Sequence, residues 1–277
     1  MRCAQCGFVF IPNITNSKAI ISDRPVLGDL PPTARTSNNL KDLEGSWEIP
    51  IIQFKEREFP AMRRNTLKAL KRLERYTQLG PMLDLGCGTG IQLHTACEHG
   101  WQGQGLEPLA GHSIYARAKF GVPVINDVLR EDTFPPDTFN AITAYQTFEH
   151  LPDPVTVLQR LVTALKPGGA LLIEVPNIDN LLVKMMGPRH RHFVIDHLNF
   201  FSAATLGRLM ENSGLKVVSV HYPARSMSIG HLADWVYHLM PFTKPLHWLG
   251  SRPWLAKRIV SVTLRDIVEV IAVKPAA

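Results

Sequence analysis

The sequence is poor in cysteine and has no long uncharged apolar run. Its 277 residues include four cysteines, too few to staple a chain of this length, so a disulfide scaffold is excluded. No run of about 18 uncharged apolar residues occurs, which predicts the absence of a transmembrane segment. The first residues also lack the apolar run of a signal peptide. We therefore expect a soluble, cytoplasmic protein.

Charged residues are also scarce relative to apolar ones. Hydrophobic residues make up 45% and charged residues 19% of the chain, a balance that excludes disorder of the whole protein. We predict an N-terminal segment with a linker over residues 1–45 and a main domain over residues 46–277. Within the main domain, residues 80–176 form the ligand-binding core, and residues 177–277 form the substrate-side region with the closing strands.

Positive charge is concentrated near the start of the main domain. Residues 55–76 contain eight Lys or Arg and three Glu, a local net charge of 8 − 3 = +5. Leu67, Leu70, Leu73 and Tyr76 recur at near-helical spacing, so the charges are expected to form the solvated face of an amphipathic helix. Contact with a polyanion is the alternative interpretation of the same charges.

Short apolar segments alternate with helical patterns from residue 80 onward, as is typical of a parallel sheet covered on both faces. The sequence therefore predicts an α/β fold with a doubly wound, mostly parallel sheet, an N-terminal helical cap and a late aromatic insertion. The expected strands span residues 82–85, 102–106, 122–125, 139–144, 170–175, 216–221 and 267–273.

Capping residues indicate where several helices begin and end. Asp153 precedes Pro154, which favours a helix start because Asp accepts free backbone N–H groups and Pro suits the first helical position. Residues 166–169 read Lys-Pro-Gly-Gly, which predicts the end of that helix. Ser202 predicts a second capped helix, and residues 46–79 are expected to be helical.

The strongest chemical pattern is a glycine-rich loop after the first predicted strand. Residues 83–90 read Leu-Asp-Leu-Gly-Cys-Gly-Thr-Gly, and glycines there allow a close approach of the backbone to a ligand. Glu107 ends the second strand, where an acid can accept two ribose hydroxyls, and Asp127 follows the third strand. Because the carboxyl ends of parallel strands meet at one edge, these groups are expected to lie together.

The spacing of the loop distinguishes between nucleotides. A nicotinamide site favours Gly-x-Gly-x-x-Gly, but Ile91 holds the last position here. The stretch Asp84-x-Gly-x-Gly-x-Gly instead resembles the first motif of class I S-adenosylmethionine (SAM)-dependent methyltransferases. The likeness continues through residues 149–154 and 165–169, and within that superfamily the chain is similar to ubiquinone-biosynthesis-like small-molecule methyltransferases.

The resemblance implies SAM as the cofactor and a seven-stranded sheet of order 3-2-1-4-5-7-6 with the last strand antiparallel. Glu107 would bind the ribose diol, while Asp127 would meet the adenine amino group with Val128 near the ring. Tyr145 and Gln146 would border the sulfonium. The methionine part would be held by Asp84, Gly86, Gly88 and Gly90.

The expected reaction is in-line methyl transfer to a small-molecule acceptor, with O-methylation slightly favoured over C-methylation. His197 and His150 are the candidates for a general base, because neutral imidazole suits that role near neutral pH. Either histidine is alternatively a packed or backbone-bonded residue. Some relatives bind a divalent metal near Glu149, with an acid where this chain has Gln146, so no metal is predicted.

Two segments remain open to several interpretations. Residues 230–259 carry five aromatic residues, and we expect packing, with a substrate lid or peripheral membrane contact as alternatives. Cys3 and Cys6 resemble half of a zinc ribbon, but a closed zinc site needs four ligands. The incomplete knuckle is therefore either a relic or the remainder of a truncated gene start.

Two rival functions differ in class from small-molecule methylation. One is RNA or protein methylation using the basic residues 55–76, although no nucleic acid partner is expected. The other is a non-catalytic cofactor-binding protein. The sequence indicates neither the acceptor nor the oligomeric state.

Overall fold

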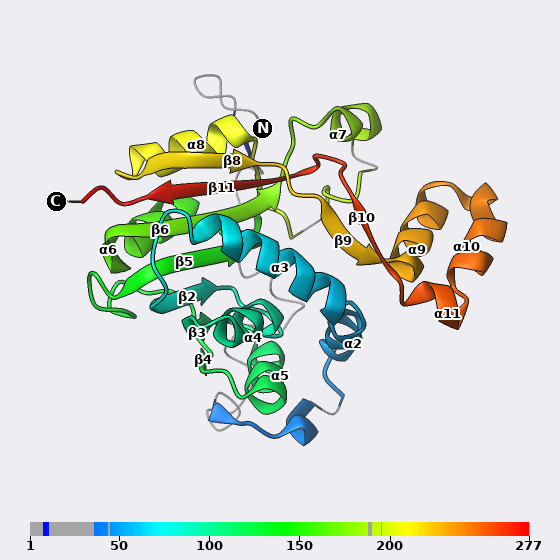
Figure 1. Cartoon of the computed structure of the whole chain (residues 1–277), viewed down its shortest axis with the longest axis horizontal. Coiled ribbons are helices and arrows are strands. Elements are labelled where there is room, and N and C mark those ends of the chain that lie inside the picture. The colour runs from blue at the N-terminus through cyan, green and yellow to red at the C-terminus, as the bar shows by residue number, and fades with distance from the viewer. Residues whose placement is uncertain (1–7, 11–35, 44, 188–189, 195, 277) are drawn as a thin grey trace.

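The computed structural model contains one large mixed sheet flanked by helices (Figure 1). Cys3 and Cys6 of the predicted knuckle lie outside the described residues, so the zinc prediction is not tested. The structure describes residues 8–10, 36–43, 45–187, 190–194 and 196–276.

Seven strands form the sheet in the order β4-β3-β2-β5-β6-β11-β8. Only β11 and its neighbours pair antiparallel within this sheet. Numbered along the chain, this order is the predicted 3-2-1-4-5-7-6 with an antiparallel last strand. The strands are β2 (Pro81–Leu85), β3 (Gln102–Leu106), β4 (Val124–Ile125), β5 (Phe139–Tyr145), β6 (Leu165–Pro176), β8 (Lys216–His221) and β11 (Ile267–Val273).

Residues 165–169 differ from the prediction. The preceding helix ends at Ala164, so its predicted end is confirmed, but β6 begins at Leu165 and not at the predicted residue 170, and Leu165 pairs with Phe139. The chain beyond β11 supplies the partner, because Gly168 N–H donates to Lys274 O at 2.9 Å and Lys274 N–H donates to Gly169 O at 3.0 Å. The early start of β6 was not predicted because this partner lies about a hundred residues away in the sequence.

Helices cover both faces of the sheet, as expected for buried parallel strands. Leu158 on α6 and Leu206 on α8 pack against one face, and Leu70 on α3 and Ala96 on α4 against the other. The helices of these layers are α3 (Phe59–Leu73), α4 (Ile91–Glu98), α5 (Ala110–Phe120), α6 (Pro154–Ala164) and α8 (Ala203–Asn212).

The predicted caps are present. Asp153 accepts from Thr156 N–H at 3.0 Å, and Ser202 accepts from Thr205 N–H at 3.2 Å. Residues 46–79 are not one helix, however, because α2 (Ile49–Arg57) ends before Glu58 and α3 begins after it. Pro60 lacks the N–H that a continuous helix would need at this point.

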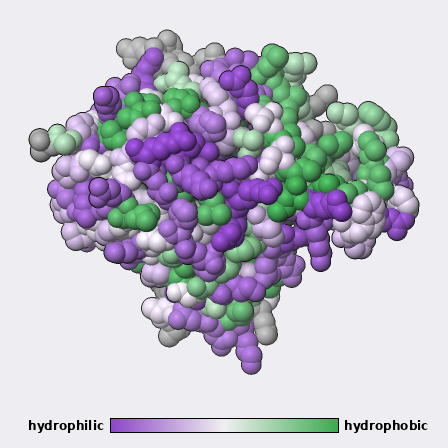
Figure 2. All heavy atoms as spheres, viewed as in Figure 1, coloured by the Kyte–Doolittle hydropathy of each residue, from purple (hydrophilic) through white to green (hydrophobic). Residues whose placement is uncertain are grey.

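The basic residues on α3 form a solvated face. Leu70 and Leu73 are fully buried, whereas Lys68 and Lys71 are exposed, and Figure 2 shows hydrophilic side chains across this helix. Arg72 is held by Glu269 through two contacts of 2.6 Å. The amphipathic interpretation is therefore confirmed for α3, and contact with a polyanion remains untested.

The late insertion is a strand ladder carrying a group of short helices. The aromatic side chains of the insertion were predicted to be packed in the interior. Trp235 and Tyr237 are partly buried, but the prediction is wrong for Phe242, Trp248 and Trp254, which are exposed. The elements are β9 (Arg225–Ser228), α9 (Ile229–Leu239), the 3-10 helix Pro241–Thr243, α10 (Lys244–Gly250), α11 (Pro253–Ala256) and β10 (Ile259–Val262).

Several shorter elements complete the described chain. Among the described residues, none of the helices has the length and apolar character needed to cross a bilayer. These elements are β1 (Val9–Phe10), the 3-10 helix Leu40–Leu43, the 3-10 helix Phe148–His150, α7 (Leu181–Met186) and β7 (Asn199–Phe200).

Candidate active site

The glycine-rich loop leaves the sheet at the end of β2 and turns into α4. Gly86, Gly88 and Gly90 all have positive φ, at 68°, 53° and 77°, a region that side chains other than glycine rarely adopt. A Cβ on Gly90 would lie 2.6 Å from Ala116 Cβ, but a Cβ on Gly88 would meet no described atom within 4 Å. The loop is thus packed at its end and open to a ligand at its centre.

Asp84 supplies a buried acid beneath this loop. Its Oδ1 accepts from Thr143 Oγ1 at 2.8 Å, while its buried Oδ2 has no hydrogen-bond partner among the described residues. Burial raises the pKa of Asp84 to about 7. An unpartnered buried carboxylate oxygen is costly, and the amino group of a methionine moiety would satisfy it.

Glu107 lies at the end of β3 and faces the loop. Its carboxylate accepts from Gly88 N–H at 2.7 Å and from Leu109 N–H at 2.9 Å. Burial raises the pKa of Glu107 to about 7, against the lowering effect of these two N–H groups. Each oxygen retains a second lone pair for a ribose hydroxyl.

Asp127 and Val128, which follow β4, were predicted to lie beside the adenine, and these roles stay predictions. Asp127 pairs with Arg130 and accepts from Val128 N–H at 2.7 Å, and the Val128 side chain is exposed. Asn126 was not predicted as a site residue, but its Nδ2 donates to Glu107 O at 2.8 Å. Its buried Oδ1 has no hydrogen-bond partner in the described chain. Its position directly before Asp127 was the available signal.

A polar network at the ends of β5 and β6 was not predicted. Gln146 has a positive φ of 51° and donates from Nε2 to Glu174 Oε1 at 3.2 Å. Arg225 on β9 donates to the same oxygen at 2.6 Å. Because Glu174 and Arg225 are distant in sequence from Gln146, only the fold reveals that the three side chains form one network.

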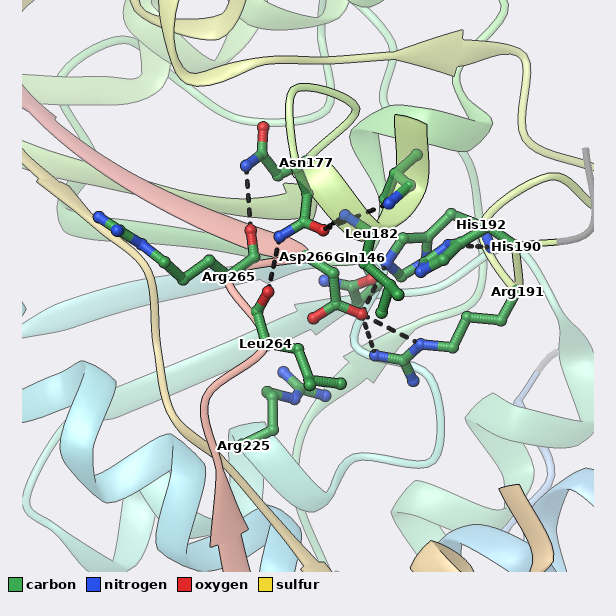
Figure 3. A network of polar contacts seen from close by, with 12 residues as sticks. Gln146, Asn177, Leu182, His190, Arg191, His192, Arg225, Leu264, Arg265 and Asp266 are labelled. Carbon is green, nitrogen blue, oxygen red and sulfur yellow. Dashed lines mark hydrogen bonds and ion pairs between the residues drawn. The ribbon is translucent and has the colours of Figure 1, made fainter. Parts of the chain in front are cut away.

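A second network holds the segment after β6 against the start of β11 (Figure 3). Arg191 donates to Asp266 Oδ2 at 2.7 Å, and His192 Nε2 lies 3.3 Å from the same oxygen. Burial raises the pKa of Asp266, but the neighbouring His192 and the charge of Arg191 outweigh it and hold the pKa well below its usual range. This anchorage fixes the backbone that carries His197.

The two predicted histidines meet at this edge of the sheet. The rings of His150 and His197 are edge to face, with centroids 4.7 Å apart. His197 Nδ1 donates to His192 O at 2.9 Å, and His150 Nδ1 donates to Asp196 O at 2.9 Å. Burial and the neighbouring His150 lower the pKa of His197 to about 4, so its ring is neutral at physiological pH.

Glu149 lies beneath this histidine pair and is almost fully buried. Neither carboxylate oxygen has a hydrogen-bond partner among the residues described here, and burial raises the pKa of Glu149 to about 8. Potential ligand atoms of Glu149, His150 and His197 lie within 4.8 Å of one another. These donors could hold a metal, so the predicted absence of metal remains untested.

Replacing Glu149 with Gln should stabilise the protein increasingly as pH rises. The folded-state pKa of Glu149 lies above its ordinary value of 4.5, so folding opposes ionisation and the parent loses stability between about pH 4.5 and 8. We expect the variant's free energy of unfolding to exceed the parent's by a few kcal/mol at pH 8 and to match it near pH 4. Urea unfolding across this range measures the difference.

Glu131→Gln is the matched control, because Glu131 is exposed. It should track the parent at every pH. A constant difference between Glu149→Gln and the parent from pH 4 to 8 would show that Glu149 ionises freely in the folded protein.

An N-terminal helix closes the site from the side. The carboxylate of Glu48, at the start of α2, accepts from Gly111 N–H at 3.1 Å and His112 N–H at 2.8 Å. At its other end, Glu58 accepts from Ser228 N–H at 3.0 Å. Lys55 lies between these two anchors, and burial together with the charge of Arg225 lowers its pKa.

Comparison with known proteins agrees with this arrangement. A family model described as a methyltransferase domain matches residues 54–220. The chain belongs to this methyltransferase family. The ubiquinone biosynthesis O-methyltransferase of Aeromonas salmonicida is 30% identical over 189 residues, covering 60% of this chain and 77% of that protein.

Solved structures share the fold at low identity. A SAM-dependent methyltransferase from Archaeoglobus fulgidus matches with a TM-score of 0.51 and 17% identity, covering 76% of this chain and 92% of its own. The [4+2]-cyclase SpnF matches with a TM-score of 0.51 and 16% identity, covering 76% and 82%. These likenesses show the fold alone, because one fold hosts different reactions.

The family and the site geometry together identify the cofactor. This methyltransferase uses SAM. The open backbone at Gly88, the unpartnered oxygen of Asp84 and the buried acid Glu107 lie together at the carboxyl ends of β2 and β3. The rings of His150 and His197, the two candidate bases, meet at the same edge, and the base role stays a prediction.

Proposed function

We propose that this methyltransferase transfers a methyl group to the hydroxyl of a small-molecule acceptor, with His197 as the general base. The observation that carries the proposal is the neutral His197 ring, held by His192 O at 2.9 Å beside His150. The Aeromonas salmonicida relative is an O-methyltransferase, which supports a hydroxyl acceptor over a carbon acceptor.

The residues that would hold SAM lie on the loop and on β2 and β3. Asp84 would accept from the amino group, Glu107 would bind the ribose diol, and Asn126 Oδ1 offers an acceptor beside Asp127 for the adenine amino group. SAM supplies a methyl group on a positively charged sulfur, which is an activated leaving group. The main task of the protein is therefore to align the acceptor and exclude water.

His197 is placed to receive the proton of the acceptor hydroxyl. Because its Nδ1 carries a proton donated to His192 O, the lone pair of the neutral ring lies on Nε2. A pKa of about 4 makes His197 a weak base. This favours an acceptor with an acidic hydroxyl, such as a phenol, over an aliphatic alcohol, because less driving force is needed to remove its proton.

Replacing His197 with Asn should lower kcat for a phenolic acceptor by about 10²–10⁴-fold while leaving S-adenosylhomocysteine (SAH) binding unchanged. Acceptors are first identified by screening phenols for a mass increase of one methylene unit together with SAH release. The parent rate should fall below about pH 4 as His197 becomes protonated, and the variant should lack this fall.

His238→Asn is the control for loss of an imidazole, because His238 is exposed on α9. It should leave kcat unchanged. Full kcat in His197→Asn would remove His197 as the base. SAH binding without turnover of any acceptor would favour a non-catalytic role, and steeply salt-dependent RNA binding would favour a nucleic acid acceptor.

A further inference from the structure

The helical end of the late insertion exposes an unusual number of large apolar side chains. We call residues 240–258 the insertion tip; it comprises the 3-10 helix, α10 and α11. In Figure 2, apolar side chains gather at the end of the molecule formed by β9, β10 and these helices. The exposed fractions are 46% for Met240, 81% for Phe242, 63% for Leu246, 58% for Trp248, 43% for Leu249 and 65% for Trp254.

The charges around these side chains are mainly positive, and the nearby acid Asp234 contacts His247 Nε2 at 2.8 Å. Residues 235–262 contain four Lys or Arg and neither Asp nor Glu. The four cationic side chains, Lys244, Arg252, Lys257 and Arg258, are exposed. The Arg252 guanidinium carbon lies 3.8 Å from the centroid of the Trp248 ring, so cationic and aromatic groups share one surface.

We propose that the insertion tip docks on a lipid bilayer surface that carries anionic headgroups. Phe and Trp side chains would enter the boundary between headgroups and acyl chains, while the four cations would bind the anionic lipids. Aromatic side chains are favoured at this boundary, and each nearby Lys or Arg adds an electrostatic attraction. The charge of the tip therefore complements this occupant.

The geometry disfavours a second copy of the chain as the occupant. A symmetric contact between two copies would place the same patch on both sides. This would bring eight Lys or Arg side chains together, against one nearby acid per copy, Asp234, which already contacts His247. The apolar residues also project from short helices of seven and four residues. These lie at the end of the molecule opposite the C-terminus (Figure 1), as suits contact with a broad surface.

The tip is connected directly to the acceptor side of the site. The β9–β10 ladder pairs Ile259 with Ser228 at the tip end and Val262 with Arg225 at the site end. Arg225 contacts Glu174 at 2.6 Å. Docking would therefore turn the acceptor side of the site toward the lipid surface. The docking itself does not depend on the proposed methyl transfer.

Vesicle flotation tests the proposal with the full chain. Vesicles of equal parts phosphatidylglycerol and phosphatidylcholine should carry the parent upward, and pure phosphatidylcholine should carry much less. Replacing Phe242, Trp248 and Trp254 together with Ser should weaken binding to the anionic vesicles by more than about tenfold. The double variant Lys244→Glu and Lys257→Glu should lose the preference for anionic vesicles, as should the parent at high salt.

The matched control replaces three exposed apolar residues away from the tip. Leu79, Val155 and Val220 are 50%, 48% and 47% exposed, and their combined change to Ser should leave flotation unchanged. SAH binding by each variant confirms that it is folded. The proposal is overturned if the parent does not float with anionic vesicles or if the triple Ser variant floats like the parent. A dimer that the triple Ser variant dissociates, without vesicle binding, would assign the tip to contact between copies.

Discussion

Replacing Asp84 with Asn should weaken SAH binding by about 100-fold at pH 8, because a charged hydrogen bond to the ligand's amino group is lost. Asp84 is nearly fully buried, and its Oδ2 has no hydrogen-bond partner among the described residues. Asn keeps the shape of the side chain and the contact from Thr143, so the change removes the charge with little change in packing.

The pH dependence distinguishes loss of this charge from a general disturbance of the loop. The pKa of Asp84 is about 7 in the ligand-free protein, and the ligand's ammonium group favours the ionised carboxylate. Affinity should therefore rise by up to about tenfold per pH unit between pH 5 and 7 from this group and then level off. Glu107, with a pKa of about 7, adds a second contribution in the same direction.

Calorimetric titration with SAH from pH 5 to 8 measures both effects. The difference between parent and Asp84→Asn should narrow as pH falls, since Asp84 becomes neutral in the parent. Asp132→Asn, a change at an exposed position, should leave the parent's curve intact. A difference of the same size at pH 5 and pH 8 would contradict the assignment of Asp84 to the amino group.

Replacing Glu107 with Ala should also weaken SAH binding by about 100-fold, because two hydrogen bonds from the ribose diol to a carboxylate are removed. The change also leaves Gly88 N–H and Leu109 N–H without their acceptor. Lower affinity alone would therefore not separate a ligand contact from a change in the loop.

A ligand without the diol separates these two explanations. The parent should bind SAH far more tightly than its 2′,3′-dideoxy analogue, because the analogue lacks the two hydroxyls that would donate to the carboxylate. Glu107→Ala should bind the two ligands about equally. If the variant discriminates between them as strongly as the parent, Glu107 does not bind the ribose.

The sheet and its ligand loop were predictable because their signals are local. Positive φ at Gly86 and Gly88 favours glycine, and strands buried on both faces give continuous apolar runs such as residues 170–173. The caps at Asp153 and Ser202 depend on residues only three positions away. Such short-range patterns locate the strands and helices along the chain. The order of the strands in the sheet was predicted from the family resemblance.

The features that were not predicted from the sequence depend on contacts between distant segments of the chain. The start of β6 is extended because Lys274 pairs with Gly168 and Gly169. Glu174 and Arg225 meet across 51 residues, and Asp266 draws His192 against β11. No local pattern encodes these pairings, which is why the sequence located the cofactor side of the site better than the acceptor side.

The most direct test of the account is a crystal structure of the protein with bound SAH. We predict that both ribose hydroxyls lie within hydrogen-bond distance of the Glu107 carboxylate and that the amino nitrogen lies within hydrogen-bond distance of Asp84 Oδ2. The homocysteine sulfur should then face the side of the site that holds His197. A ribose directed away from Glu107, or a ligand bound elsewhere on the protein, would contradict the account.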